Sequence, residues 1–258
     1  MMQVTCECWP YPRWIAHRGA GKLAPENTLA AFRLGANRGY RMFECDVKLS
    51  ADGVAFLMHD DTLQRTTNGD QHPAAHSSEV GGDHPWSTLS QLDAGSWHSR
   101  TFAGEPLPSL ENIARYCLHN GYFLNIEIKA TPGLERLTGE VVAQHAARLW
   151  AGATVPPLLS SFKPDSLQAA RDAHSQLPRG LLLDSLWQGW LEAARTLDCV
   201  AIICNHALWD ESSFAQASNA GFRALSYTVN DEWAAQRLIK LGTDGIITDR
   251  VDLFSPAT

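Results

Sequence analysis

The chain has 258 residues, of which 45% are hydrophobic and 19% are charged, and its formal net charge is −7. This length is typical of one large α/β domain or of two small ones. The negative charge argues against a general nucleic-acid-binding protein, because such proteins usually carry a basic face. It does not argue against an anionic small-molecule substrate, whose binding depends on local charge.

No segment has the features of a membrane span or of a secretory signal. No stretch approaches the roughly 20 apolar residues that cross a bilayer, and residues 1–13 lack a basic region followed by an apolar run. The six cysteines do not form the paired CxxC pattern of a zinc site. We therefore expect a cytoplasmic protein with reduced thiols, no stable membrane insertion and no nucleic-acid partner. No pattern indicates an oligomeric state.

Apolar segments alternate with segments of helical periodicity along most of the chain. We expect strands at 14–16, 42–48, 54–58, 123–128, 157–161, 180–184, 200–204, 223–229 and 245–248. Helices are expected at about 26–38, 109–120, 135–151, 164–174, 187–197, 210–220 and 231–241. Gly39 and Gly242 are suited to end the first and last helices, and Asn230 is suited to cap the last one at its start. This alternation predicts a parallel sheet covered by helices.

The second and third predicted strands are too close in sequence to be a parallel pair. Only residues 49–53 separate them, whereas a parallel crossover needs about a dozen residues or more. We therefore expect an antiparallel hairpin that turns at Asp52-Gly53. Folding about residues 51 and 52 places His59 opposite Glu44. Without this extra strand, eight parallel strands remain, which predicts a TIM (βα)8 barrel closed by 245–248.

Residues 60–108 interrupt the alternation of strands and helices. The segment is rich in Gly, Pro, Ser, His and Trp and has no long helical period. A loop of this length in a compact domain is usually a cap or a binding element. Because it follows the hairpin, we expect it over the mouth of the barrel, as an insertion in a single domain that spans residues 1–258.

Ionisable side chains gather where four of the predicted strands end. They occur in the motifs His17-Arg18-Gly19, Glu44-Cys45-Asp46, His59-Asp60 and Glu127-Ile128-Lys129. Residues two apart on a strand share a face, so Glu44 and Asp46 point the same way, and so do Glu127 and Lys129. Barrels of this kind carry their chemistry at the carboxyl ends of the strands. The motifs therefore predict one site at the barrel mouth.

Three carboxylates of this site suit a divalent metal ion. Glu44, Asp46 and Glu127 repel one another, and their pKa values rise unless a cation lies between them. An all-oxygen site with room for water suits Mg²⁺ or Ca²⁺ better than zinc. Such an ion binds a phosphate oxygen and offsets charge in a transition state.

The remaining four side chains suit phosphate chemistry. Arg18 can hold a phosphate with two hydrogen bonds, and Lys129 can add a point charge. His17 and His59 titrate near neutral pH and can act as base and acid. Each has a structural alternative when taken alone: His17 as a hydrogen-bonding residue at a strand end, and Lys129 as an ion-pair partner of Glu127. Their occurrence together favours a site, because buried charges are costly unless they pair or bind metal.

The combined motifs resemble those of the glycerophosphodiester phosphodiesterase family in order and in approximate spacing, over nearly the whole chain. The shared motifs are His17-Arg18-Gly19, Pro25-Glu26-Asn27-Thr28, Glu44-x-Asp46, His59-Asp60, Asn125-x-Glu127-x-Lys129, Ser160-Ser161-Phe162 and Tyr227-Thr228-Val229-Asn230. The sequence is most similar to the short bacterial cytosolic enzymes, which share stretches like residues 21–31 and 93–97. The resemblance implies a TIM barrel with a small inserted region.

The resemblance also implies roles for individual residues. It implies that the metal ion is bound by Glu44, Asp46 and Glu127. It implies that His17 and His59 are the acid–base pair. It implies that Arg18 and Lys129 bind the phosphate. Phe162 and Tyr227 fall where family members line the substrate pocket, with ordinary packing at the barrel mouth as the alternative.

The expected function is metal-dependent hydrolysis of glycerophosphodiesters, such as glycerophosphocholine or glycerophosphoethanolamine, to sn-glycerol 3-phosphate and an alcohol. His17 fits the base and His59 the acid, with either the glycerol 2-hydroxyl or a water as nucleophile. One alternative is a phospholipase C- or D-like activity on lipid phosphodiesters, which would favour an apolar rim. The other is a non-catalytic phosphodiester-binding protein, which would usually lack one of these histidines or carboxylates.

The insertion departs from the family pattern between residues 70 and 86, where it is longer and richer in histidine than we expect. This region should face the leaving alcohol. Four histidines of the insertion raise the question of a second metal site, and they are His72, His76, His84 and His98. Their irregular spacing favours solvated loop residues instead.

Overall fold

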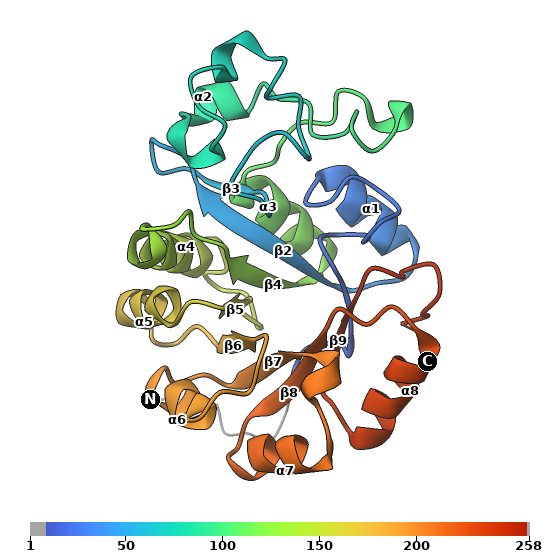
Figure 1. The fold of residues 1–258 in the computed structure, drawn as a ribbon. Coiled ribbons are helices and arrows are strands. Elements are labelled where there is room, and N and C mark those ends of the chain that lie inside the picture. Colours follow the sequence, from blue (N-terminus) through green and yellow to red (C-terminus); the bar gives the residue numbers. More distant parts are fainter. Residues whose placement is uncertain (1–8, 257–258) are drawn as a thin grey trace.

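The computed structural model of the protein describes residues 9–256, and its centre is a closed barrel of parallel strands (Figure 1). The barrel strands are β1 (Trp14–Ala16), β2 (Met42–Leu49), β4 (Phe123–Ile128), β5 (Leu158–Ser161), β6 (Arg179–Leu183), β7 (Ala201–Asn205), β8 (Arg223–Tyr227) and β9 (Gly245–Thr248). They neighbour one another in the order β1-β9-β8-β7-β6-β5-β4-β2, and pairing of β1 with β2 closes the ring. The predicted TIM barrel, closed by residues 245–248, is confirmed.

Helices surround the barrel and follow its strands in sequence (Figure 1). They are α1 (Leu29–Asn37), α3 (Leu110–Asn120), α4 (Glu135–Leu149), α5 (Pro164–Ala173), α6 (Trp190–Thr196), α7 (Glu211–Asn219) and α8 (Glu232–Leu241). A short 3-10 helix, His206–Leu208, precedes α7. The part of the chain that the structure describes contains no helix long and apolar enough to cross a membrane.

The first and last helices begin at residues that are set by capping side chains and not by the hydrophobic periodicity. The helix expected from residue 26 begins only at Leu29, because the Thr28 hydroxyl caps it by accepting from the Ala31 amide. The expected Asn230 cap of α8 is wrong. Asp231 caps that helix through the Ala234 amide, and the Asn230 side chain is bound to Asp249 instead.

The extra strand β3 (Ala55–Leu57) pairs antiparallel with β2, as expected, but in a register that differs by one residue. Val47 pairs with Leu57 and Leu49 with Ala55, so that extension of the ladder would set His59 opposite Cys45 rather than Glu44. The turn is centred on Asp52 because the Ser50 amide donates to the Val54 carbonyl, which closes a five-residue loop over 50–54. The pairing predicted by a turn at residues 51 and 52 is therefore wrong, although the hairpin still delivers His59 to the site.

Residues 60–108 form an irregular region with its own small core. It contains only α2 (Trp86–Leu89) and 3-10 turns at Pro73–Ala75, Gly81–Asp83 and Arg100–Phe102. Its buried side chains, which include Leu63, Leu89 and Leu92, join Met58 in a cluster separate from the barrel core. Figure 1 shows the region on one side of the barrel, beyond β2 and β3. None of these residues lines the central cavity described below, although Asp60 contacts His59 and Arg65 contacts Glu26 beside it, and the position over the mouth stays a prediction.

Alternation along the strands creates two apolar layers and places the site above one of them. On β2, Phe43, Cys45 and Val47 face the helices and join the large outer core. Met42 points into the barrel and joins an inner apolar cluster that fills it from below. The next inward positions of the same strand carry Glu44 and Asp46. The barrel interior therefore changes from apolar to acidic within one strand.

The cysteines that the structure describes are buried and free, in agreement with the expected reduced thiols. They are Cys45, Cys117, Cys199 and Cys204. Cys6 and Cys8 lie outside the described residues.

Candidate active site

A cavity at the carboxyl ends of the barrel strands collects nearly all of the predicted site residues. Its lining consists of His17, Arg18, Glu44, His59, Asn125, Glu127, Lys129, Phe162, Leu182, Tyr227, Thr228 and Ile247. Asp46 is the one predicted residue outside this lining, and it lies 1% exposed against Arg18 and Asn27. The strands and the segments that follow them thus bring together the nine side chains predicted for the metal, acid–base, phosphate and pocket roles.

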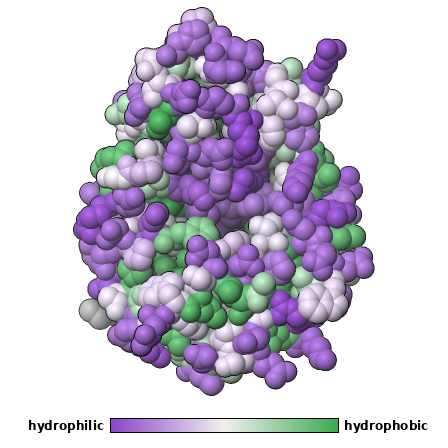
Figure 2. Space-filling model, in the orientation of Figure 1, coloured by the Kyte–Doolittle hydropathy of each residue, from purple (hydrophilic) through white to green (hydrophobic). Residues whose placement is uncertain are grey.

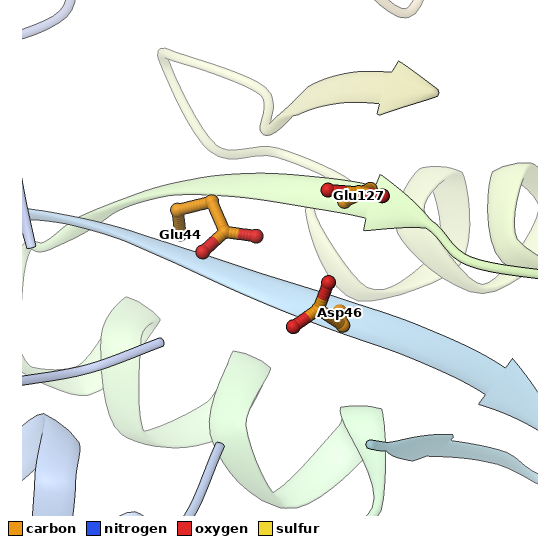
Figure 3. A group of neighbouring side chains, drawn as sticks. All are labelled: Glu44, Asp46 and Glu127. Carbon is orange, nitrogen blue, oxygen red and sulfur yellow. The ribbon is translucent and has the colours of Figure 1, made fainter. Parts of the chain in front are cut away.

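Glu44, Asp46 and Glu127 form the acidic centre of the site (Figure 3). One oxygen from each lies within 4.8 Å of the others, a set of acidic ligands that the described residues provide nowhere else. Glu44 and Asp46 come from β2, and Glu127 comes from the neighbouring β4 (Figure 3). Two of the oxygens, Glu44 Oε1 and Asp46 Oδ1, are buried and accept no hydrogen bond. Buried oxygens of this kind are usually hydrogen-bonded or bind an ion, so the group fits a divalent cation.

The protonation of the acidic centre shows the cost of its burial. Burial raises the pKa of Glu127 to about 7, and Asp46 nearby adds to the effect. Burial and the two neighbouring carboxylates raise the pKa of Glu44 well above its ordinary value. Burial also acts to raise the pKa of Asp46, but Arg18, His59 and Lys129 outweigh it and bring the net pKa below the ordinary value. The expected rise is thus seen for the two glutamates and not for Asp46.

Two cations flank the acidic centre. The Arg18 backbone amide donates to Glu44 at 3.0 Å, while its guanidinium lies 3.1 Å from Asp46 Oδ2. Lys129 Nζ donates to Glu127 Oε1 at 2.9 Å and is 4.0 Å from Asp46. Asn27 holds Asp46 on the other side, donating through Nδ2 and accepting from the Asp46 amide. The acidic and basic groups are therefore fixed before any ligand binds.

The loop after β1 requires glycine for its path. Arg18 has a positive φ of 50°, an uncommon conformation for a side chain of this size. Gly19 (φ +99°) follows it and packs against α1, where a Cβ would come within 2.7 Å of the Ala31 methyl. A Cβ on Gly21 would lie 2.2 Å from the backbone of Asp249. These close approaches hold the loop against α1 and against the segment after β9.

His17 is oriented by a carboxylate that the sequence reading missed. Its Nδ1 lies 2.7 Å from Asp249 Oδ1, and its Nε2 is 3.8 Å from Glu44 Oε2. Asn230 holds Asp249 in turn, donating to Oδ2 at 2.9 Å and accepting from the Asp249 amide at 3.0 Å. An ionised carboxylate only accepts hydrogen bonds, so Nδ1 carries the proton and Nε2 faces the cavity. Asp249 directly follows the last predicted strand, and this position is the sequence signal that could have identified it as a site residue.

His59 has a similar partner on the opposite side of the site. Its Nδ1 lies 2.7 Å from Asp60 Oδ1. Burial lowers the pKa of His59 below its ordinary value, although Asp46 and Asp60 oppose the shift. Asp60 and Glu26 both bind the side chain of Arg65, a residue of the insertion that sequence reasoning did not single out.

Phe162 and Tyr227 form an aromatic wall beside the charged groups. Their rings meet edge to face with centroids 5.6 Å apart, and Lys129 Nζ lies 5.5 Å from the Phe162 ring centroid. Tyr227 is fixed by a hydrogen bond from its hydroxyl to the Leu183 carbonyl. Asn125, deeper in the cavity, is 1% exposed and both polar atoms of its side chain lack protein partners.

Polar and apolar residues gather on different parts of the face that Figure 2 shows. In the orientation of Figure 1, hydrophilic residues cover the upper and central parts of the visible face, and hydrophobic residues gather mostly in its lower half (Figure 2).

None of the four histidines considered for a second metal site belongs to a metal-binding group within residues 9–256. His84 and His98 instead bond the backbone carbonyls of Ser78 and Lys22.

Comparison with known proteins places the chain in a family. Residues 17–253 match the sequence model of the Glycerophosphoryl diester phosphodiesterase family. The chain is 32% identical to YhdW of Bacillus subtilis over 248 residues, covering 93% of this chain and 95% of that one. It is 30% identical to a glycerophosphodiester phosphodiesterase of Caldanaerobacter subterraneus, covering 91% and 93%. A solved Oleispira antarctica phosphodiesterase, in complex with the product sn-glycerol-3-phosphate, superposes with a TM-score of 0.85 at 31% identity, covering 96% and 97%. The chain therefore belongs to the glycerophosphoryl diester phosphodiesterase family.

Proposed function

We propose that this protein hydrolyses glycerophosphodiesters to sn-glycerol 3-phosphate and an alcohol. The observation that carries the proposal is the acidic centre with its two unpartnered oxygens, flanked by two cations and two histidines. An acidic group alone would repel a phosphodiester. Together with a divalent cation, Arg18 and Lys129, it becomes a site that attracts one.

Glu44, Asp46 and Glu127 are the residues that would hold Mg²⁺ or Ca²⁺. The all-oxygen donor set and the unpartnered oxygens on Glu44 and Asp46 support this assignment. When bound, the ion supplies positive charge that offsets the charge on phosphate during the reaction. Lys129 and Arg18 already pair with these carboxylates, so their positions relative to the centre are set in advance.

Arg18 and Lys129 are proposed to bind the phosphate. Both side chains are only partly exposed, at 17% and 26%, and both line the cavity. A planar guanidinium can donate two parallel hydrogen bonds to a phosphate, and an ammonium adds charge without fixing direction. Arg18 would therefore set the orientation of the phosphate.

His17 and His59 are proposed to move the protons. Neutral His17 takes a proton at Nε2 from the nucleophile, which is a water or the glycerol 2-hydroxyl, as the new bond to phosphorus forms. Protonated His59 gives its Nε2 proton to the alcohol oxygen as the bond from phosphorus to that oxygen breaks. Asp249 and Asp60 hold the two Nδ1 atoms and stabilise positive charge on either ring. If the 2-hydroxyl attacks first, a cyclic phosphate forms, and water opens it with the proton transfers reversed.

The proposal is tested by turnover of glycerophosphocholine, with choline and sn-glycerol 3-phosphate quantified separately. We expect activity with Mg²⁺ or Ca²⁺, loss of activity in EDTA, and recovery after the ion is restored. Glu127→Gln should lower kcat by at least about 100-fold, because it removes a charged metal ligand. Glu140→Gln, a change at an exposed position of α4, serves as the matched control.

The other outcomes separate the alternatives. Full activity after complete metal removal would contradict the metal assignment. Release of choline from lysophosphatidylcholine in preference to glycerophosphocholine would favour a lipid phosphodiesterase. Binding of glycerophosphocholine without turnover would identify a non-catalytic phosphodiester-binding protein.

A further inference from the structure

A single arginine of the insertion links the two sides of the site. Arg65 Nε and Nη2 donate to the two oxygens of Asp60, at 2.5 and 2.9 Å. Its Nη1 and Nη2 donate to the two oxygens of Glu26, both at 2.8 Å. Asp60 holds His59, and Glu26 accepts from Arg18 Nη1 at 2.8 Å. An unbroken chain of charged contacts thus runs from His59 through Arg65 to Arg18.

We propose that Arg65 is a positioning residue that fixes the His59 imidazole and the Arg18 guanidinium relative to each other. The inference rests on the proposed function, in which these two groups act on the same phosphodiester. Arg65 itself does not line the cavity and touches neither reacting group. It acts through Asp60 and Glu26, and so connects proton transfer to phosphate binding.

The geometry of the contacts requires a guanidinium. Arg65 presents two bidentate faces, one to each carboxylate, and a lysine ammonium cannot match both at once. Hydrogen bonding from Arg65 holds the pKa of Asp60 far below its ordinary range, so Asp60 stays ionised beside His59. The Arg65 side chain is 44% exposed, which limits what these ion pairs add to global stability. Such a residue is better suited to set geometry than to hold the fold together.

The backbone that carries Arg65 is anchored in the insertion. Leu63 is buried in the small core of that region, and Thr67 donates through its amide and hydroxyl to the Leu63 carbonyl. Thr66 and Thr67 are 6% and 5% exposed. The turn therefore presents the Arg65 side chain from a fixed base, and the insertion gains a role in catalysis without lining the cavity.

The inference is tested with Arg65→Met and Arg65→Lys, and with Arg115→Met as the control. Arg115 also binds a carboxylate, Glu111, but on the exposed face of α3. We expect Arg65→Met to lower kcat for glycerophosphocholine about 10- to 100-fold and to weaken sn-glycerol 3-phosphate binding, measured by calorimetry with Mg²⁺, about fivefold. Arg65→Lys should recover only a small part of both losses. Melting temperatures near that of Arg115→Met would show that both variants are folded.

A ligand-free measurement separates this inference from the proposed function. In protein labelled with ¹⁵N-histidine, Arg65→Met should change the ring nitrogen shifts of His59 and leave those of His17 unchanged, since Asp249 has no contact with Arg65. Unchanged His59 shifts, or full recovery by Arg65→Lys, would overturn the positioning role. If the wild-type protein turns over no glycerophosphodiester but the His59 shifts still respond, the proposed function fails while the link through Arg65 stands.

Discussion

The two histidines of the site have the same immediate partner and different supports. Each ring nitrogen Nδ1 lies 2.7 Å from an aspartate oxygen. Asp249, beside His17, is held by the Asn230 amide and by the close approach of Gly21, both parts of the closed barrel. Asp60, beside His59, is held by Arg65 from an irregular insertion. The aspartate beside His17 is therefore held by neutral contacts within the barrel, and the aspartate beside His59 is held by ion pairs at the edge of the barrel.

The barrel therefore supports one histidine–aspartate group of the site, and the insertion supports the other. The barrel supplies a fixed first group, with side-chain exposures of 17% for His17 and 15% for Asp249. The His59 group is more open, with exposures of 31% for His59 and 26% for Asp60. If Arg65 positions the second group as proposed, changes in the sequence of the insertion should adjust the proposed acid His59 and the proposed phosphate ligand Arg18 together, without altering the barrel.

Removing either histidine should give the largest effect and tell their roles apart. We expect His17→Ala and His59→Ala each to lower kcat for glycerophosphocholine by about 10²- to 10⁴-fold, as for lost general acid or base catalysis. With glycerophospho-p-nitrophenol, whose leaving group needs no proton, His59→Ala should lose no more than about tenfold, while His17→Ala should keep its full loss.

The control for this comparison is His119→Ala, at an exposed position on α3. Reversal of the two responses would mean that His17 is the acid and His59 the base. Near-normal rates for both variants on glycerophosphocholine would contradict the acid–base assignment altogether.

The acidic centre where both histidine groups meet should respond to pH in a way that neither group does. Because burial raises the pKa of Glu127 from 4.5 to about 7, its contribution to folding stability is present below the unfolded value and is lost as pH rises through 7. A shift of this size corresponds to about 3 kcal/mol. Metal binding should reverse the loss, so the rise in Tm on adding Mg²⁺ or Ca²⁺ should be at least about 5 °C larger near pH 8 than near pH 6.

Glu127→Gln sharpens this test because it removes the charge and keeps the shape. In EDTA near pH 8, the variant should melt above the wild-type protein, since it lacks a buried charge whose cost the ion pair with Lys129 offsets only in part. Its Tm should also respond less to added metal. A metal-induced rise in Tm that is equal at both pH values would show that the carboxylates do not bind the ion.

The sequence predicts the parts of this site that depend on spacing along one strand. Alternation placed Glu44 with Asp46 and Glu127 with Lys129, and the five-residue connection at 49–53 required a hairpin. It did not predict the hairpin register, which depends on how Ser50 and Val54 close the turn. The sequence pattern also favours Asn230 as a helix cap. Its actual partner, Asp249, lies 19 residues away, and a contact over that distance leaves no mark in the local pattern.

Arg65 and Asp249 were missed for a related reason. Each supports a catalytic candidate from a segment without periodicity, and Arg65 reaches Glu26 across 39 positions of sequence. Asp249 at least follows a predicted strand, where barrel residues can reach the mouth. Arg65 lies in an insertion whose path is set by a small core and by tertiary contacts, and neither leaves a period in the sequence.

Replacing the two aspartates should separate the barrel-held group from the insertion-held group. We expect Asp249→Asn to lower kcat about 10- to 100-fold with little change in KM, because its effect is confined to His17. Asp60→Asn should lower kcat by a similar factor and also raise KM about threefold or more, since Arg65 loses a charged partner and the contact through Glu26 to Arg18 weakens. Asp172→Asn, at an exposed ion pair with Arg136, is the control. If KM rises for Asp249→Asn and not for Asp60→Asn, the assignment of the two supports is wrong.

Ionic strength should give the smallest effect and should act on one side only. The Debye length falls from about 10 Å at 0.1 M salt to about 3 Å at 1 M, which weakens exposed ion pairs such as those of Arg65 more than buried neutral contacts. We expect kcat at saturating substrate to fall about two- to threefold over this range in the wild-type protein and to stay nearly constant in Arg65→Met, where the ion pairs are already absent. The ¹⁵N shifts of His59 should move with salt while those of His17 do not, because Asn230 and Asp249 hold His17 through partly buried hydrogen bonds. An equal salt response of both histidines would remove the physical basis for distinguishing the barrel-held group from the insertion-held group.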